Sequence, residues 1–246
     1  MAEWFETWFG EEYLALYAHR DDEDATQLVD LLRRLLPWEP GWRVLDVGCG
    51  PGRHARALDR LGSSPIGVDL SLTLLRRAQG VTDAPLIRAD MRALPIRSGA
   101  FDLTVNLFTS FGYFEDDAEH ALALREMVGT VRPGGWFVLD YLDARAVVKG
   151  LVPQESQVLN GEPVTITREL TGGKRFVVKT FHLADGRTFV ERVRLLEAGE
   201  LEVMIRSAGA EVRHRFGDYQ GTPLSAVVRD DGHGARTLLI AERCRC

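Results

Sequence analysis

The sequence predicts an α/β fold in which a doubly wound, mostly parallel sheet of seven strands carries helices on both faces. Three observations lead to this prediction. Strand and helix patterns alternate over residues 41–141, they resume over residues 197–246, and between these segments the helix patterns stop. Strands that alternate with helices form parallel sheets with helices on both faces. With 246 residues, 45% of them hydrophobic, the chain is long enough for one sizeable core.

Residues 1–40 are predicted to form an N-terminal helical cap, with a helical pattern over residues 3–37. One buried helix face is indicated by the spacing of Leu28, Leu31, Leu32, Leu35 and Leu36, and Pro37 and Pro40 end the pattern. An aromatic-rich stretch comes before these leucines and contains Trp4, Phe5, Trp8, Phe9, Tyr13 and Tyr17. These rings either pack the cap onto the core or line a ligand pocket.

The core is predicted to comprise residues 41–141 and 197–246. Its elements in chain order are strand 42–47, helix 53–61, strand 65–69, helix 71–79, strands 85–89 and 101–107, helix 117–130, strand 135–141, helix 197–208, and strands 210–216 and 235–243. Ser71 is a suitable N-cap for the second of these helices. Residues 132–135 (Arg-Pro-Gly-Gly) predict a turn between a helix and a strand, because proline and glycine interrupt helices.

Residues 142–196 are predicted to form an antiparallel β insertion. Residues 164–170, 175–183 and 187–195 are rich in β-branched and aromatic side chains, and Gly172-Gly173 and Asp185-Gly186 stand between them. Such dipeptides are typical of tight hairpin turns. We therefore expect a three-stranded meander. Because so small a sheet does not fold alone, we expect it to pack on the core, either as a lid or as a dimer interface.

The most informative motif is the glycine loop that follows the first core strand. Gly48, Gly50 and Gly52 alternate between an apolar strand and a helical pattern. Glycine lets the backbone turn tightly and lets a ligand lie against it. The helix that follows offers unpaired N–H groups to that ligand. The loop therefore predicts a site for a nucleotide-type cofactor.

Two classes of cofactor compete for this loop. A dinucleotide site needs Gly-x-Gly-x-x-Gly, but Arg53 occupies the third glycine position. The alternative is Asp-x-Gly-x-Gly-x-Gly, which begins at Asp46. Further carboxylates, Asp69 and Asp90, follow the next two strands, where ligands bind in doubly wound sheets. A carboxylate at such a position accepts hydrogen bonds from two ribose hydroxyls.

This series resembles the class I S-adenosylmethionine-dependent methyltransferases from about residue 40 to 141, and the final strand pair also fits. The resemblance implies a Rossmann-like fold, S-adenosylmethionine as the cofactor and S-adenosylhomocysteine as the product. It implies that Gly48 and Gly50 approach the methionine part, Asp69 binds the ribose and Leu70 packs on the adenine. The cofactor-binding positions implied in this way are Asp46, Gly48, Cys49, Gly50, Asp69, Leu70, Asp90, Met91 and Leu107.

The segment 106–114 occupies the position that faces the methyl acceptor in this family. It lacks the Asn-Pro-Pro-Tyr type of sequence found in methyltransferases of adenine or glutamine amides. It is similar to small-molecule methyltransferases, including amino-sugar N-methyltransferases, which also carry a β-rich insertion after the fifth strand. The expected function is in-line methyl transfer to a nitrogen or oxygen of a small molecule. The alternatives are an RNA or protein methyltransferase and a non-catalytic S-adenosylmethionine-binding subunit.

Methyl transfer requires that the nucleophile, the methyl carbon and the sulfur are held in line, and a base sometimes removes a proton. The candidate catalytic residues are His120, Tyr113 and Tyr17, and the candidate substrate-binding residues are Tyr13, His19, Arg20 and Phe108. No metal is expected, because the sequence has neither a His-Glu-x-x-His nor a Cys-x-x-Cys motif.

Composition limits the partners and the compartment. The formal net charge of −6 argues against a broad phosphate-binding surface, so no nucleic acid is expected. No run of about eighteen apolar residues predicts a membrane span, and the N-terminus lacks the features of a secretion signal. Cys49, Cys244 and Cys246 do not form a disulfide framework, so a reduced, cytoplasmic protein is expected. A homodimer remains open.

Overall fold

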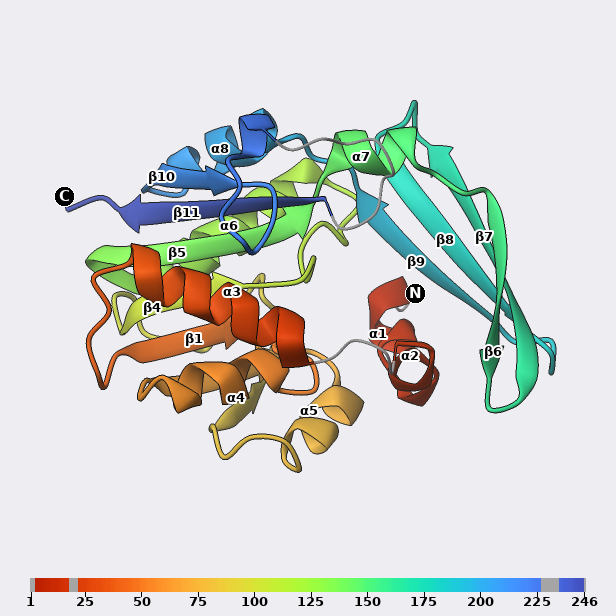
Figure 1. Ribbon diagram of the computed structural model, residues 1–246, viewed down its shortest axis with the longest axis horizontal. Helices are drawn as coiled ribbons and strands as arrows, with labels where there is room; N and C mark the ends of the chain where they lie inside the picture. Colours follow the sequence, from red (N-terminus) through yellow and green to blue (C-terminus); the bar gives the residue numbers. More distant parts are fainter. Residues whose placement is uncertain (1–2, 18–21, 227–234, 246) are drawn as a thin grey trace.

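The computed structural model describes residues 3–17, 22–226 and 235–245. Its core is a seven-stranded sheet in the order β10-β11-β5-β4-β1-β2-β3 (Figure 1). The strands are β1 (Arg43–Val47), β2 (Ser64–Asp69), β3 (Leu86–Arg88), β4 (Phe101–Asn106), β5 (Val131–Leu142), β10 (Ala210–Phe216) and β11 (Arg236–Arg243). Strands β1 to β5 pair in parallel, and β11 is antiparallel to both of its neighbours. The predicted α/β fold is therefore confirmed.

Helices cover both faces of this sheet. The core helices are α3 (Asp22–Leu35), α4 (Arg53–Arg60), α5 (Leu72–Ala78), α6 (Asp117–Thr130) and α8 (Ala198–Ser207), and a short 3-10 helix, η1, spans Leu224–Ala226. The leucine face of α3 packs with α4 against one side of the sheet. The Ser71 hydroxyl accepts a hydrogen bond from Leu74 N, as expected of the N-cap of α5. Among the described residues, no helix combines the length and the hydropathy that a membrane span requires.

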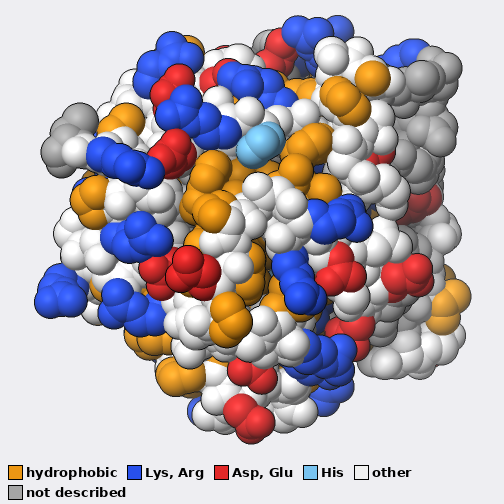
Figure 2. Space-filling model, turned by 60° about the vertical axis from the view of Figure 1, so that its left-hand side comes forward, with side chains coloured by type: hydrophobic (Ala, Val, Ile, Leu, Met, Phe, Trp, Pro, Cys, Tyr) orange, Lys and Arg blue, Asp and Glu red, His pale blue; other side chains and the backbone are white. Residues whose placement is uncertain are grey.

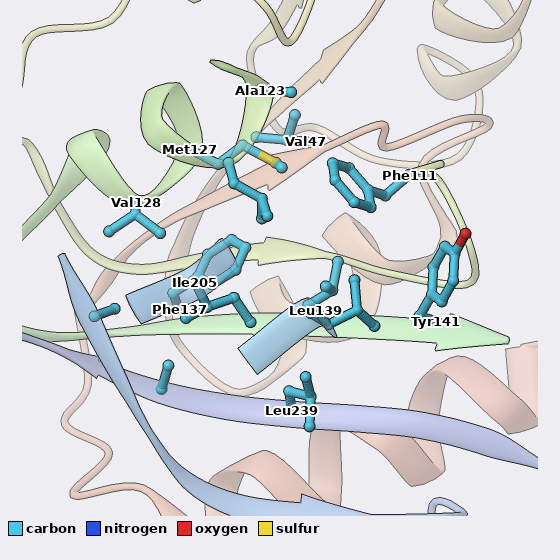
Figure 3. Close-up of a cluster of buried hydrophobic side chains, with 14 of the residues drawn as sticks. Val47, Phe111, Ala123, Met127, Val128, Phe137, Leu139, Tyr141, Ile205 and Leu239 are labelled. Atoms are coloured by element: carbon cyan, nitrogen blue, oxygen red, sulfur yellow. The ribbon is translucent and has the colours of Figure 1, made fainter. Parts of the chain in front are cut away.

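Figure 3 shows the packing on the opposite face. Side chains of α6, among them Met127, and Ile205 of α8 meet Phe137 and Leu139 of β5 and Leu239 of β11. All of these side chains are fully buried. Burial of a large apolar side chain contributes about 1.5–3 kcal/mol, so this cluster holds α6 and α8 against β5 and β11.

The N-terminal segment differs from the single helical pattern predicted over residues 3–37. It forms three helices, α1 (Trp4–Trp8), α2 (Glu11–Leu16) and α3. Gly10, in extended conformation, separates the first two. The parts separate because their apolar faces have different partners: α3 packs on the core, whereas Trp8 stacks on Phe181 of the insertion at 4.3 Å. In Figure 1, α1 and α2 lie between the two sheets.

The insertion also differs from the expected three-stranded meander. It begins with a helix, α7 (Ala144–Lys149), and then forms a four-stranded antiparallel sheet of β6 (Gln154–Leu159), β7 (Glu162–Thr171), β8 (Phe176–Leu183) and β9 (Thr188–Arg194). The Asp143 side chain caps α7 by accepting a hydrogen bond from Ala146 N. The sequence of β6 (Gln-Glu-Ser-Gln-Val-Leu) is mostly polar because β6 is an edge strand that pairs only with β7.

The insertion is tied to the core at β9. Arg194 N donates to Gly112 O at 2.7 Å, and the Tyr141 hydroxyl donates to Arg194 O. The buried Arg194 side chain also forms an ion pair with Asp117 of α6 at 3.1 Å. These contacts join the insertion, the 106–114 segment and the core sheet at one point.

Replacing Gly112 with alanine is expected to lower the free energy of unfolding by about 2 kcal/mol. The backbone of Gly112 has φ +94°, and a Cβ there would overlap the Tyr141 hydroxyl and lie 3.0 Å from its ring. Gly173→Ala is the matched control, because Gly173 has φ +68° but a Cβ added there would meet nothing within 4 Å. Urea unfolding measures both. Equal losses in the two variants would contradict the packing role of Gly112.

Candidate active site

The glycine loop between β1 and α4 adopts a conformation that glycine permits. Gly48, Gly50 and Gly52 have φ of +73°, +53° and +86°. A Cβ at Gly48 would lie 2.6 Å from Ser110 Cβ, so this position needs both the unusual φ and the missing side chain. Gly48 N and Cys49 N both donate to Val68 O, at 2.7 and 3.0 Å, which fixes the loop to the end of β2.

This loop forms one wall of a cleft at the carboxyl ends of β1, β2 and β4, which we call the glycine-loop cleft. Asp69 lines this cleft and is held by backbone groups: its carboxylate accepts from Gly50 N and from Ser71 N, each at 2.8 Å. Burial raises the pKa of Asp69, although these backbone hydrogen bonds oppose the shift. These two hydrogen bonds therefore fix the position and the orientation of the Asp69 carboxylate.

Asp90 lies on the same cleft and belongs to an ion-pair network. Arg92 donates to Asp90 at 2.6 Å and also to Glu3 of the N-terminal segment at 2.7 Å and Glu119 of α6 at 2.6 Å. Burial opposes the charged form of Asp90, but the hydrogen bonds from Arg92 outweigh it and lower the pKa of the carboxyl group. Asp90 is therefore an ionised acceptor beside the cleft.

The structure brings the predicted cofactor-binding residues together, with one exception. The glycine-loop cleft is lined by Gly48, Cys49, Gly50, Asp69, Leu70, Asp90, Met91 and Leu107. Asp46 is instead sealed beneath the loop, with 1% of its surface exposed. Neither of its carboxylate oxygens has a hydrogen-bond partner among the described residues. Burial, followed by repulsion from Asp69, raises the pKa of Asp46 to about 7.

A second hollow adjoins this cleft, and we call it the sheet hollow. Its volume is about 230 Å³. It shares the rings of Phe9, Tyr13, Phe108 and Tyr113 with the glycine-loop cleft. The four-stranded sheet contributes Arg168, Val177, Lys179, Glu191 and Val193 to its lining, and β11 contributes Arg236. The two spaces therefore share a boundary that these aromatic side chains line.

The predicted acceptor residues divide between these spaces. Tyr13, Phe108 and Tyr113 line both, and the Tyr113 hydroxyl donates to Thr109 O. Tyr17 lines the glycine-loop cleft, and its hydroxyl contacts Lys179 and Glu191 of the sheet hollow. The predicted residues His19 and Arg20 lie outside the described residues.

His120 lies away from both spaces. Its side chain is fully buried between the rings of Phe111 and Phe114, and its Nε2 accepts from Phe114 N at 3.3 Å. Burial lowers its pKa, which favours the neutral form. The prediction of a base here relied on closeness in sequence to the 106–114 segment, whereas the helix turns this side chain into the core. We therefore do not propose His120 as a catalytic residue.

Several residues of the site were not predicted from the sequence. Two guanidinium groups lie close to the Phe108 ring, that of Arg53 at 4.1 Å and that of Arg236 at 5.1 Å from its centroid. Arg236 in turn pairs with the buried Asp140 at 2.9 Å. Of these residues, only Arg53 stood out in the sequence, because it replaces the third glycine of a dinucleotide motif. Arg236 and Asp140 lie far from it along the chain, so no local pattern indicated their contacts.

Asp140 organises the backbone that separates the two spaces. It is fully buried and accepts from Phe108 N and from the Tyr219 hydroxyl, each at 2.8 Å. Phe108 and Thr109 have φ of +57° and +61°, which is unusual for residues with side chains. Burial, followed by the charge of Asp140, raises the pKa of Tyr219, so this phenol stays a hydrogen-bond donor. Asp140 therefore offsets the strain of the loop that carries Phe108.

Comparisons with known proteins agree with this geometry. Residues 44–135 match a family model described as a methyltransferase domain. The chain is 28% identical over 241 residues to the cypemycin N-terminal methyltransferase of a Streptomyces species, a match that covers 85% of this chain and 94% of that protein.

The solved structures that are similar over almost the whole chain include two named methyltransferases. The CcbJ methyltransferase of Streptomyces caelestis has a TM-score of 0.77 at 18% identity, covering 97% of this chain and 99% of its own, which shows the likeness of fold. CalS10, an amino pentose methyltransferase of Micromonospora echinaspora solved with S-adenosylmethionine bound, has a TM-score of 0.69 at 25% identity, with 94% and 96% covered.

Proposed function

Because this chain is an S-adenosylmethionine-dependent methyltransferase with the class I fold, we propose that it methylates an amine nitrogen of a small molecule. The sheet hollow carries this proposal. It adjoins the glycine-loop cleft, holds about 230 Å³, and combines aromatic rings with a carboxylate, Glu191. A concave space that combines aromatic side chains with a few placed polar groups is typical of small-molecule sites.

The residues of the glycine-loop cleft fit the cofactor. Gly50 lines the cleft with open space where a Cβ would stand, and the carboxylates of Asp69 and Asp90 line the same cleft. When bound, S-adenosylmethionine supplies a methyl group activated by a positively charged sulfur. We assign Asp69 to the ribose hydroxyls, Leu70 and Met91 to the adenine, and Asp90 to its amino group, with the glycine loop and Leu107 beside the methionine part.

The protein's own side chains would promote the reaction by holding the reacting groups in position and excluding water. Phe9, Tyr13, Phe108 and Tyr113 stand between the two spaces and would exclude water from the reacting atoms. The pair of guanidinium groups on Phe108 and the hydrogen bonds to Asp140 hold this boundary in one arrangement. Alignment of nucleophile and leaving group accounts for much of the rate enhancement in such displacements.

Nitrogen is the first acceptor atom to test because of the names of two similar proteins. One is named for an N-terminal methyl transfer and the other for an amino pentose. Oxygen acceptors are the second class. A nucleic-acid substrate is disfavoured by the net charge of −6. In agreement, Figure 2 shows Lys and Arg side chains interspersed with Asp and Glu side chains on one face of the molecule.

The experiment is a panel of small amines, alcohols and carboxylic acids of similar size, assayed for release of S-adenosylhomocysteine. We expect product from amines and little from the matched alcohols and acids. A matched panel of short peptides tests whether a peptide N-terminus is also accepted. Turnover only with RNA or a folded protein would contradict the proposal.

A further inference from the structure

The inner face of the four-stranded sheet carries one row of charged side chains between apolar rows. Arg168 of β7 pairs in register with Lys179 of β8, which pairs with Glu191 of β9. On either side, the corresponding rows are Leu170, Val177 and Val193, and Ile166, Phe181 and Phe189. Charged groups on an enclosed apolar face are costly unless they are paired or used.

Two hydrogen bonds to one carboxylate oxygen of Glu191 hold its side chain in position. Its Oε2 accepts from Trp8 Nε1 at 3.1 Å and from the Tyr17 hydroxyl at 3.2 Å. Trp8 is 1% exposed and stacks on Phe181, so this donor is rigid. Lys179 Nζ donates to the Tyr17 oxygen at 2.6 Å, which fixes the phenol as a donor toward Glu191.

The second oxygen of Glu191 is available to a ligand. Among the described residues, no donor bonds to Oε1, and this oxygen is not among the sealed polar atoms. Of the three cations among the described residues that line the hollow, Arg168 pairs with Glu155 at 2.5 Å and Arg236 with Asp140 at 2.9 Å, and Lys179 is directed to the Tyr17 hydroxyl at 2.6 Å. Glu191 is the one carboxylate among the described residues that line the sheet hollow.

We propose that Glu191 is the residue that binds the acceptor amine and takes its proton, an inference that rests on the proposed function. The ammonium form of the acceptor donates one N–H to Oε1. The proton passes to the carboxylate, and the electron pair of that N–H bond stays on nitrogen as the lone pair that attacks the methyl carbon. Glu191 becomes a neutral carboxylic acid. Tyr17 and Lys179 are positioning residues that hold Glu191 through Oε2.

Glu191→Gln is the decisive variant, because its amide oxygen can still accept from Trp8 and Tyr17 and so preserves the packing. Glu169→Gln is the matched control, since Glu169 neighbours Arg168 on β7 but lies exposed on the opposite face of the sheet. Both are made in the full chain and saturated with S-adenosylhomocysteine.

The first readout is calorimetric binding of cyclohexylamine, with cyclohexanol as its neutral match. We expect the wild type and Glu169→Gln to prefer the amine at least tenfold, and Glu191→Gln to lose this preference. A wild type without the preference, or a Glu191→Gln variant that keeps it, overturns the proposal. This readout needs no turnover, so it decides the role of Glu191 even if no amine in the panel is methylated and the proposed function fails.

The second readout is the pH dependence of kcat with the best amine of the panel. The other titratable groups that face the hollow are Tyr13, Tyr17, Tyr113, Arg168, Lys179 and Arg236. We expect Glu191→Gln to lose about 100-fold in kcat at neutral pH, the scale of general-base catalysis, and to recover as the free amine forms at higher pH. A loss confined to KM, or an unchanged pH profile, overturns the proton-accepting role.

Discussion

Replacing Asp140 with alanine is expected to lower the free energy of unfolding by about 3–5 kcal/mol, the range for removing one partner of a buried ion pair. Asp140 is fully buried, and the substitution removes the carboxylate that accepts from Arg236 Nε, the Tyr219 hydroxyl and Phe108 N. Urea unfolding followed by tryptophan fluorescence measures the loss.

Asp102→Ala is the control for this substitution. Asp102 also accepts from a backbone N–H and from an arginine, but its side chain is 18% exposed, so water replaces the lost partners. We expect a loss of about 1 kcal/mol for this partly exposed pair. If Asp140→Ala costs no more than Asp102→Ala, the Asp140 cluster does not support the loop that carries Phe108.

Replacing Asp69 with alanine is expected to weaken binding of S-adenosylhomocysteine by about 3 kcal/mol, the upper range for hydrogen bonds to a charged group, which is more than 100-fold in Kd. Two losses combine. The ribose hydroxyls lose their proposed acceptor, and Gly50 N and Ser71 N lose the carboxylate that fixes the loop. Isothermal titration calorimetry measures the change.

Asp83→Ala is the matched control, because Asp83 is an exposed carboxylate that does not line the glycine-loop cleft. It removes the same charge without touching the loop and is expected to leave the affinity within twofold. An Asp69→Ala variant with wild-type affinity would contradict the assignment of Asp69 to the ribose.

The core and the glycine-loop cleft were predictable because their determinants are local in sequence. An apolar strand, a glycine loop and a helix follow one another within residues 43–60, and the structure has them at nearly the predicted bounds. Asp69 and Asp90 come after the next two strands, and parallel pairing brings such strand ends to one edge.

The sheet hollow was not predictable in the same way. Glu191, Lys179 and Tyr17 meet only because β9, β8 and the end of α2 pack together. In the sequence, Lys179 and Glu191 are single charges within strand patterns, which is also typical of a solvated face. His120 shows the converse: it is near the 106–114 segment in sequence, but the first turns of α6 direct it into the core.

The most direct test of the central claim is methyl transfer itself. The wild-type chain is incubated with S-adenosylmethionine and the matched panel, and the products are examined by mass spectrometry for an added methyl group and its position. The proposal predicts a methylated small amine, with the new methyl on nitrogen. A methyl group found only on oxygen, carbon or a macromolecule would contradict it.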